Sequence, residues 1–366
     1  MNCIYFGICG SCTLYDKSYE EQLAYKKESI KELFKALHVN DFPIFPSPST
    51  HYRSRAEFRI WHDGRKISYA MSVMDKKSVV CIENCPKVVK SIYNLMPKLK
   101  TALENNEILS HKLFAVEFLN GTSGILVSLL YHKQLDDNWQ VEASKLCQTL
   151  SINIIGRAKK QKRVIGSDSL TQSLHVEDKE FVYTITEGGF SQPNNNVNTQ
   201  MIQWVCSHVG HGKDLLELYC GHGNFTLPMA GKFSKVLATE IAKSSITSAQ
   251  KSAKQVGINN INFLRMSVED LTSALNGERE FNRLREIDLD SFHFSHVLVD
   301  PPRAGIDEKS LTFLKRFDKI IYISCNPQTL KRDIEFLNYK IEDFALFDQF
   351  PHTLHVEAGA ILAKKF

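Results

Sequence analysis

The 366-residue sequence contains no run of the roughly 18 apolar residues that a membrane-spanning helix needs. Its first residues, Met1-Asn2-Cys3-Ile4, lack the basic start and apolar core of a signal peptide. It also lacks internal repeats and low-complexity tracts, which argues against solenoids and fibres. We therefore expect a globular cytoplasmic protein without membrane contact, in which the nine cysteines stay reduced.

A strong charge imbalance is missing too, since the net charge is only +4, and this says little about partners. The composition, 43% hydrophobic and 23% charged, is that of a globular protein. The chain exceeds the roughly 250 residues at which a single hydrophobic core stops growing. We expect two domains, and a monomer without an obligate protein partner.

The residue pattern changes character along the chain. The first half begins with a helical segment near Tyr19 to Leu37. Two strand-like runs, 114–119 and 124–131, flank the hairpin signal Asn120-Gly121 and favour antiparallel sheet. From about residue 180, strands and helices alternate, which is typical of a parallel sheet. The sequence thus predicts an N-terminal α+β domain (1–175) and a C-terminal doubly wound, Rossmann-like α/β domain (176–366), linked near 163–177.

A glycine turn in the second half predicts a nucleoside site. The strand-like run 214–218 enters a turn that holds Gly221 and Gly223, glycines that let backbone approach a ligand closely. Glu240 ends the next strand, where a carboxylate can accept hydrogen bonds from a ribose. The turn lacks the third glycine of dinucleotide sites and the Lys-Ser/Thr pair of triphosphate sites, which favours S-adenosylmethionine over NAD or ATP.

Two further strands end on residues that suit chemistry. The strand 296–299 is followed by Asp300-Pro301-Pro302-Arg303, in which Asp300 is either a cleft residue or a turn former. Methyltransferases that act on exocyclic amines carry Asn-Pro-Pro-Tyr/Phe at such a place, so an amine target is disfavoured. The apolar run 319–323 ends at Ser324-Cys325-Asn326-Pro327. Cys325 is either a nucleophile at the carboxyl edge of the sheet or a buried packing residue.

Together these strings resemble the RNA uracil-5-methyltransferase family over nearly the whole chain, and most of all its branch that acts on the T-loop uridine of tRNA. The motifs that carry the resemblance are Tyr219-Cys220-Gly221-x-Gly223-Asn224, Val299-Asp300-Pro301-Pro302-Arg303, Ser324-Cys325-Asn326-Pro327, Phe347-Asp348-Gln349-Phe350-Pro351-His352-Thr353-x-His355-Val356-Glu357, His51-Tyr52-Arg53-x-Arg55-Ala56-Glu57-Phe58-Arg59-Ile60-Trp61, His111-Lys112-Leu113-Phe114 and Leu129-Leu130-Tyr131-His132-Lys133.

The resemblance implies transfer of a methyl group from S-adenosylmethionine to carbon 5 of uridine 54 in the tRNA T-arm, through a covalent adduct of the cysteine with carbon 6. It implies Cys325 as the nucleophile and Glu357 as the proton acceptor; without it, Glu357 would pass for an exposed turn carboxylate. The residues that it implies for cofactor binding are Gln192, Tyr219, Asn224, Glu240 and Asp300. His222 departs from the Asn that is more usual in this loop.

RNA binding has a weaker signature. Two basic clusters occur, and each alone is more often a solvated face than an RNA contact: Arg53, Arg55, Arg59, Arg65 and Lys66, and Arg157, Lys159, Lys160, Lys162 and Arg163. The target base must leave its stack to reach Cys325. The resemblance implies that Arg59 and Phe114 contact the opened loop, and that Phe190 and Arg303 hold the extruded base.

The cysteines near the start of the chain suggest a metal site and leave the RNA substrate open. Cys3, Cys9 and Cys12, with the distant Cys85, resemble the set that binds a [4Fe–4S] cluster in the related ribosomal RNA enzymes. A zinc site or a vestigial site is the alternative, and Cys81 competes with Cys85 as fourth ligand. Two other functions therefore stay open beside tRNA methylation: methylation of 23S rRNA, and a non-catalytic role in binding or remodelling RNA. The absence of an extra N-terminal β-barrel favours tRNA.

Overall fold

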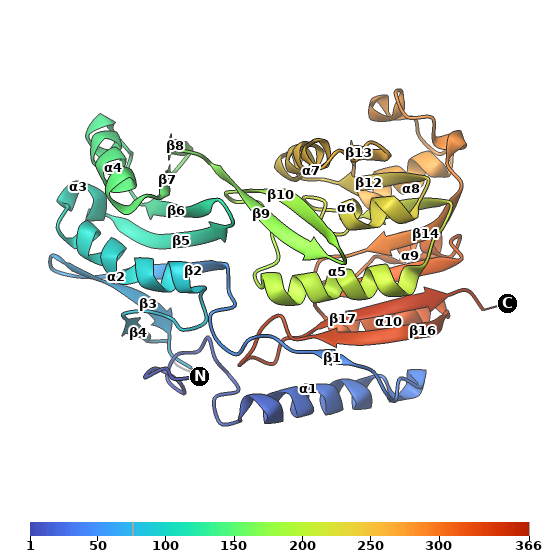
Figure 1. The fold of residues 1–366 in the computed structure, drawn as a ribbon, viewed down its shortest axis with the longest axis horizontal. Helices are drawn as coiled ribbons and strands as arrows, with labels where there is room; N and C mark the ends of the chain where they lie inside the picture. Colours follow the sequence, from blue (N-terminus) through green and yellow to red (C-terminus); the bar gives the residue numbers. More distant parts are fainter. Residues whose placement is uncertain (75–76, 366) are drawn as a thin grey trace.

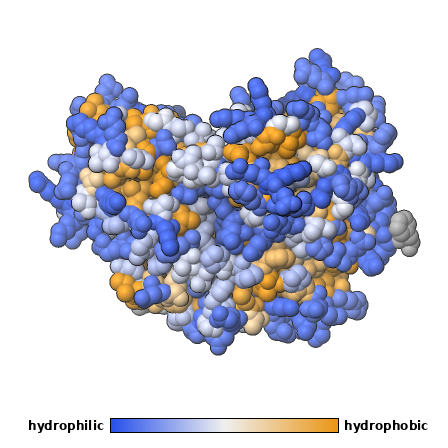
Figure 2. Space-filling model, viewed as in Figure 1, coloured by the Kyte–Doolittle hydropathy of each residue, from blue (hydrophilic) through white to orange (hydrophobic). Residues whose placement is uncertain are grey.

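The computed structural model describes residues 1–74 and 77–365. The chain forms two lobes that lie side by side (Figure 1), and the outline of the molecule is indented between them (Figure 2). Of the helices in this part of the chain, none combines the length and the apolarity needed to cross a membrane.

The C-terminal lobe is built on one eight-stranded sheet. Its central strands run parallel, whereas β17 pairs antiparallel with β15 and β16. In spatial order the strands are β1 (Ile44–Phe45), β16 (Lys340–Phe347), β17 (Glu357–Ala363), β15 (Lys319–Ser324), β14 (Phe294–Val299), β11 (Asp214–Leu218), β12 (Lys235–Glu240) and β13 (Ile261–Arg265).

Both faces of this sheet are covered, because its strands are apolar on both sides. In β15, Ile320 and Tyr322 pack into one core cluster, and Ile321 and Ile323 pack into the other. One face carries α1 (Tyr19–Leu33), α8 (Val268–Leu275), α9 (Glu308–Leu314) and α10 (Pro327–Leu337); the other carries α5 (Asn195–Val209), α6 (Thr226–Met229) and α7 (Lys243–Gln255). The predicted doubly wound fold is confirmed.

The strand order reverses between β11 and β14. From β11 the chain proceeds outward to β12 and β13, and it then returns to place β14 and β15 on the other side. Ligands bind outside the carboxyl ends of strands at such a reversal, because the connecting helices diverge there and leave a crevice. Tyr219, Asp300 and Cys325 directly follow the carboxyl ends of three of these strands.

The N-terminal lobe has a seven-stranded sheet whose buried face packs against helices and forms its own core. Its strands are β4 (Val79–Ile82), β3 (Lys66–Ser72), β2 (Arg55–Asp63), β5 (Leu113–Gly121), β6 (Gly124–Tyr131), β7 (Asn153–Ala158) and β8 (Gln161–Ile165), and its helices are α2 (Lys90–Glu104), α3 (Glu107–Ser110) and α4 (Asp137–Leu150). The short 3₁₀ turns of the chain are η1 (Lys35–Leu37), η2 (Ala230–Lys232), η3 (Asn282–Leu284) and η4 (Leu289–Ser291).

Two details differ from the sequence-based expectations. The β5–β6 strands continue through Asn120 and Gly121, which pair with Ile125 and Gly124, so the turn lies one step later. Gly121 is needed for space, because a Cβ there would lie 2.5 Å from the carbonyl oxygen of Thr171. The expected link is also mostly strand: β8 is followed by the hairpin of β9 (Ser169–Val176) and β10 (Lys179–Thr186), which lies between the lobes (Figure 1).

The first 45 residues do not all pack with the N-terminal sheet. Strand β1 pairs in parallel with β16 of the C-terminal sheet. Ile30 and Phe34 of α1, with Phe42, join the core on one face of that sheet. The division of the chain at residue 175 stays a prediction, but α1, Phe42 and β1 belong to the packing of the C-terminal lobe.

Candidate active site

A cavity of about 490 Å³ lies at the carboxyl edge of the C-terminal sheet, at the strand reversal. It brings together residues that are widely separated in the sequence. Those of its lining residues that the sequence had singled out are Phe190, Gln192, Tyr219, Asn224, Glu240, Asp300, Arg303, Cys325 and Glu357. All the candidate catalytic and cofactor residues thus share one cavity, with two of those expected to contact RNA.

The glycine turn after β11 has the backbone shape that the sequence predicts. Tyr219, Gly221 and Gly223 have φ values of 62°, 55° and 89°, in the left-handed region that glycine tolerates best. The Glu240 carboxylate braces this turn, since it accepts hydrogen bonds from the backbone N–H groups of Gly221 at 3.2 Å and Ala242 at 2.8 Å. Each carboxylate oxygen keeps a lone pair for a hydroxyl group of a ligand.

Asn224 is held by a partner that the sequence did not reveal. Its side chain and that of Asn198 in α5 form a reciprocal amide pair, with N–O distances of 2.8 and 2.9 Å. The Tyr183 hydroxyl donates to the Asn224 carbonyl oxygen at 3.0 Å. His222, the departure from the family's usual loop, is buried against the Tyr183 ring, and burial lowers its pKa to about 4. His222 is therefore a neutral packing residue at pH 7.

Besides Glu357, two acids of raised pKa face the cavity, and one of them was missed by sequence analysis. Burial raises the pKa of Asp300 to about 7 and that of Glu217 to about 8. Glu217 lies within β11, and its Oε2 has no hydrogen-bond partner among the residues that the structure describes. A glutamate within an otherwise apolar strand was the available signal.

The residues of this cavity fit S-adenosylmethionine. That molecule carries a positively charged sulfonium and an ammonium group, and several carboxyl groups in a cavity that holds one arginine favour a cationic ligand. Glu240 suits the ribose, and the open space beside Gly221 leaves room for close approach of a ligand. Bound there, S-adenosylmethionine would supply an electrophilic methyl group.

Cys325 lies at the turn between β15 and α10. Asn326 caps α10 through a hydrogen bond from the Gln328 N–H at 3.2 Å, and its side-chain amide donates to the Arg303 carbonyl oxygen at 2.9 Å. The turn is thereby fixed to the Asp300–Arg303 segment. Burial, followed by the nearby Glu357 and Asp300 carboxyl groups, raises the pKa of Cys325 to about 11, and the Arg303 guanidinium opposes the rise.

Glu357 begins β17 and is buried. Burial, and next the Asp300 carboxyl group, hold the pKa of Glu357 well above its ordinary value, whereas Arg303 lowers it. The sequence alone favoured an exposed carboxylate at this position, and only the resemblance pointed to a functional one. A buried carboxylate of raised pKa is a strong proton acceptor once it is ionised.

A second cavity of about 610 Å³ meets the first at the cysteine. It lies between α1, the start of α10 and residues 354–356, and its lining includes Cys325 and Arg303. These two residues therefore face both cavities. A substrate that enters from the α1 side can reach the thiol while a cofactor occupies the glycine-turn side.

The other two residues expected to contact RNA lie on the N-terminal lobe. Arg59 is exposed on β2, and Phe114 on β5 stacks on His132 with ring centroids 4.0 Å apart. Neither lines the cavity at Cys325. The second basic cluster is largely paired with acids: Arg157 with Glu187, Lys162 with Asp168, and Arg163 with Asp137. Pairing reduces the charge that this cluster offers to phosphates.

Four of the cysteines in the first 85 residues share a smaller cavity of about 130 Å³. Cys3, Cys9, Cys12 and Cys85 all line it, whereas Cys81 is exposed on β4 and does not. Within residues 1–74 and 77–365, however, no group of three or more cysteine, histidine or acidic side chains is arranged to hold a metal ion. The expected [4Fe–4S] cluster therefore lacks structural support, because the thiols are gathered without the geometry of ligands.

The doubly wound sheet, the glycine turn at its reversal and the acid after the next strand define the class of S-adenosylmethionine-dependent methyltransferases. A family model described as tRNA (Uracil-5-)-methyltransferase matches residues 18–365. The chain belongs to this family and is a methyltransferase.

Named relatives and a solved structure agree with this assignment. The chain is 50% identical to the tRNA/tmRNA (uracil-C(5))-methyltransferase of Sulfurimonas denitrificans and 49% identical to that of Campylobacter concisus, over 100% of both chains in each case. It is also similar to a crystal structure of Pyrococcus abyssi tRNA (uracil-54, C5)-methyltransferase with S-adenosyl-L-homocysteine, with a TM-score of 0.74, 23% identity, and 96% and 86% of the two chains covered. At that identity the likeness supports the fold alone.

Proposed function

We propose that the protein transfers a methyl group from S-adenosylmethionine to carbon 5 of uridine 54 in the T-loop of tRNA. The observation that carries the proposal is the meeting of Cys325, Glu357 and the cofactor residues in one cavity. The names of the relatives support a tRNA or tmRNA substrate, and the resemblance of the sequence motifs to the T-loop branch of the family points to position 54. Such a substrate would be met in the cytoplasm.

Cys325 would activate the uracil ring. Carbon 5 of uracil is too weak a nucleophile to attack a sulfonium methyl group directly. Addition of the Cys325 thiolate to carbon 6 forms a carbon–sulfur bond and moves the electron pair of the ring double bond toward carbon 5 and the carbonyl at carbon 4. Carbon 5 then takes the methyl group, and the sulfonium becomes a neutral thioether.

Glu357 would complete the reaction. Its carboxylate takes the proton from carbon 5, the electrons of that bond restore the double bond between carbons 5 and 6, and the bond to Cys325 breaks. The thiolate is regenerated, so atoms and electrons balance without another reactant. Burial beside Asp300 supports this role, because it makes the ionised carboxylate a strong base.

The remaining candidates would bind and orient the two substrates. Glu240 would hold the ribose of the cofactor, with Gln192, Tyr219, Asn224 and Asp300 around the rest of that molecule. Phe190 is 66% exposed at the cavity, so its ring is free to stack on an extruded base. Arg303 would hold that base beside Cys325, and Arg59 and Phe114 would contact the opened loop.

Tritium release from carbon-5-labelled uridine tests this proposal. The substrates are unmodified tRNA, tmRNA and 23S rRNA, each with S-adenosylmethionine, and the proteins are the wild type and Cys325→Ala. We expect release from tRNA at the T-loop uridine that is lost in the variant. Release from rRNA alone would transfer the enzyme to the ribosomal branch. Release from no RNA, with RNA binding intact, would leave a non-catalytic binding or remodelling protein.

We separately propose that the thiols of the cysteine cavity bind a [4Fe–4S] cluster after a local rearrangement. The shared cavity supports it, as does buried Lys87, a cation suited to balance thiolate charge. Protein purified without oxygen should contain about four iron and four sulfide per chain. Cys85→Ser should lose them and Cys81→Ser should keep them. Zinc in place of iron, or a wild type without metal, would refute the cluster.

A further inference from the structure

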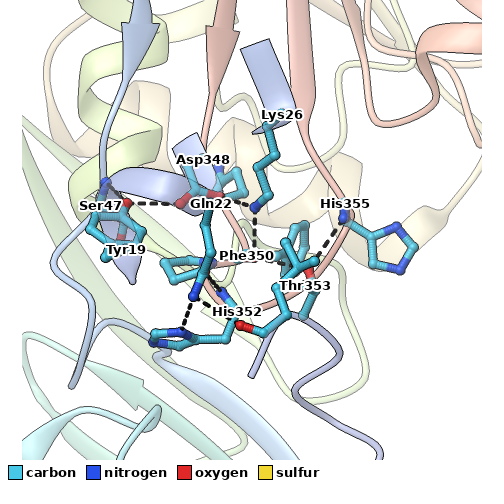
Figure 3. A network of polar contacts seen from close by, with 12 residues as sticks. Tyr19, Gln22, Lys26, Ser47, Asp348, Phe350, His352, Thr353 and His355 are labelled. Carbon is cyan, nitrogen blue, oxygen red and sulfur yellow. Dashed lines mark hydrogen bonds and ion pairs between the residues drawn. The ribbon is translucent and has the colours of Figure 1, made fainter. Parts of the chain in front are cut away.

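Helix α1 lies against the segment that joins β16 to β17 and ends at Glu357 (Figure 3). Three side chains on one face of the helix, Tyr19, Gln22 and Lys26, point at this segment. Gln22 and Lys26 are almost fully buried. Buried lysines are rare in proteins, because removing an ammonium group from water costs several kcal/mol. The mechanism proposed above uses none of these residues.

The centre of the contact is a buried ion pair. The Lys26 ammonium lies 2.6 Å from Asp348 Oδ1, and both side chains are at most 1% exposed. The same ammonium donates to the Phe350 carbonyl oxygen at 3.2 Å. The other Asp348 oxygen accepts from the Tyr19 hydroxyl at 2.7 Å, which in turn accepts from the Ser47 N–H at 2.8 Å. Such a pair adds little net stability but fixes one geometry.

A second contact holds the middle of the segment. The side-chain amide oxygen of Gln22 accepts a hydrogen bond from the backbone N–H of His352 at 2.9 Å, and the side-chain amide nitrogen of Gln22 lies 3.2 Å from His352 Nδ1. His352 Nε2 faces the Ser49 carbonyl oxygen at 2.7 Å, so Nε2 carries the proton and Nδ1 accepts. His352 also has a φ of 65°, a strained value for a non-glycine residue that persists only where its surroundings enforce it.

The position of Asp348 connects these contacts to the reaction. Phe347 at the end of β16 pairs directly with Glu357 at the start of β17, so residues 348–356 form a closed loop above that pair. Asp348 is the first residue of this loop. Because Phe347 is bonded to Asp348 and paired with Glu357, a shift of Asp348 is passed to Glu357 through this last pair of the ladder. Leu354, near the far end of the loop, lines the cavity beside Cys325.

We propose that Lys26 is a positioning residue: with Asp348 it locks the 348–356 loop, so that Glu357 faces the carbon-5 proton of the methylated adduct. This inference rests on the proposed role of Glu357. It gives α1 a function in the proton-abstraction step, although the helix contributes no group to the chemistry. The cofactor cavity has no lining residue from α1, so cofactor binding should not depend on Lys26.

The test measures tritium release, the amount of denaturation-resistant protein–RNA adduct, S-adenosylmethionine affinity and thermal stability in Lys26→Met. Misplacing a catalytic group by about 1 Å slows a reaction up to about a hundredfold, so tritium release should fall between about tenfold and a hundredfold. Methylated adduct should accumulate, because the methyl group is transferred while the proton stays. Cofactor affinity should be unchanged. Lys27→Met, which alters a partly exposed neighbour paired with Asp41, is the matched control and should behave as wild type.

The double variant Lys26→Met/Asp348→Asn separates positioning from stability. It removes both charges, so it should recover thermal stability while tritium release stays low and adduct persists. If release recovers together with stability, the pair is only structural and the inference is overturned. If Lys26→Met fails to fold, Tyr19→Phe is tested in its place. It removes one hydrogen bond to Asp348, so tritium release should fall by a smaller factor. Wild-type release in both Tyr19→Phe and the double variant would also overturn the inference.

Glu357→Gln is the reference that keeps the two proposals apart. It should trap the methylated adduct more strongly than any α1 variant. Wild-type tritium release in Glu357→Gln would refute the proposed function itself. Adduct trapping in Glu357→Gln, with wild-type behaviour in a folded Lys26→Met, would refute only the positioning role.

Discussion

Cys325 and Cys12 lie in different cavities, yet their thiols have the same raised pKa of about 11, and burial is the main cause in both. Their surroundings differ. Cys325 has the carboxyl groups of Glu357 and Asp300 beside it, whereas Cys12 has Lys87 and three other thiols. A shifted pKa alone therefore does not identify a reactive cysteine. The neighbouring groups decide what a ligand would do to the thiol.

The frameworks of the two cavities differ as well. Cys325 directly follows β15, a central strand buried on both faces. Cys3, Cys9 and Cys12 lie in the irregular segment before α1, where Cys9 forms an isolated β-bridge with Val73. A rigid sheet places side chains reproducibly, whereas turns gather them without fixing their directions. This explains why only the first cavity has the arrangement of a site.

Cys325→Ala and Cys12→Ala should differ most in their rates of tritium release. The first should lower the rate of tritium release at least about a thousandfold, because the variant lacks the thiol that adds to carbon 6 of uracil. The second should leave release within about threefold of wild type. Single-turnover assays with T-arm RNA measure both. Loss of activity in a folded Cys12→Ala variant would show that the two cavities cooperate, and would contradict the view that the reaction depends on the Cys325 cavity alone.

The next effect concerns the thiol pKa values. A cation close to a thiol stabilises the thiolate, so S-adenosylmethionine should lower the pKa of Cys325 by about one to three units. Alkylation of Cys325 in the intact protein should then reach half its maximal rate at a lower pH with S-adenosylmethionine than without it. S-adenosylhomocysteine, whose sulfur is neutral, should have a smaller effect. Cys12 should not respond to either ligand; an equal response in both cysteines would contradict the assignment of the cofactor cavity.

Glu240→Gln should weaken cofactor binding by roughly tenfold to a hundredfold, since hydrogen bonds to a charged acceptor contribute about 1.5 to 3 kcal/mol. Titration calorimetry with S-adenosylhomocysteine measures the loss. Glu286→Gln, at an exposed position, is the matched control and should bind as wild type. Unchanged binding in Glu240→Gln would mean that the carboxylate serves only to brace the Gly221 turn.

The smallest effect is on stability. Burial raises the pKa of Glu217 from 4.5 to about 8, so the folded protein holds a proton that the unfolded chain releases above pH 4.5. Stability should therefore fall as pH rises from about 4.5 to 8. In cofactor-free protein, Glu217→Gln should lose less stability between pH 4.5 and pH 8 than the wild type does. Its Tm should therefore exceed that of the wild type by at least about 2 °C at pH 9, with little difference at pH 4.5. Scanning calorimetry at both pH values checks the sign.

Much of the fold followed from residue patterns. The apolar, β-branched runs predicted the central strands, and the alternation after residue 180 predicted the doubly wound sheet. Patterns failed where distant segments decided the outcome. The hairpin turn moved past Asn120-Gly121 because Gly121 sits against β9. Strand β1 has only two residues, too few to show a strand pattern, so the sequence could not predict that it pairs with β16.

The sequence by itself determined which residues end the strands of the sheet, because strand periodicity and the prolines and glycines that follow are local properties. It therefore also determined the candidates Asp300, Cys325 and Glu240. Only the tertiary structure decided that Glu217 faces the same cavity, that α1 packs on the loop before Glu357, and that the cysteines meet without ligand geometry. These depend on contacts between residues that lie tens to hundreds of positions apart, where burial and charge pairing are set by the whole fold.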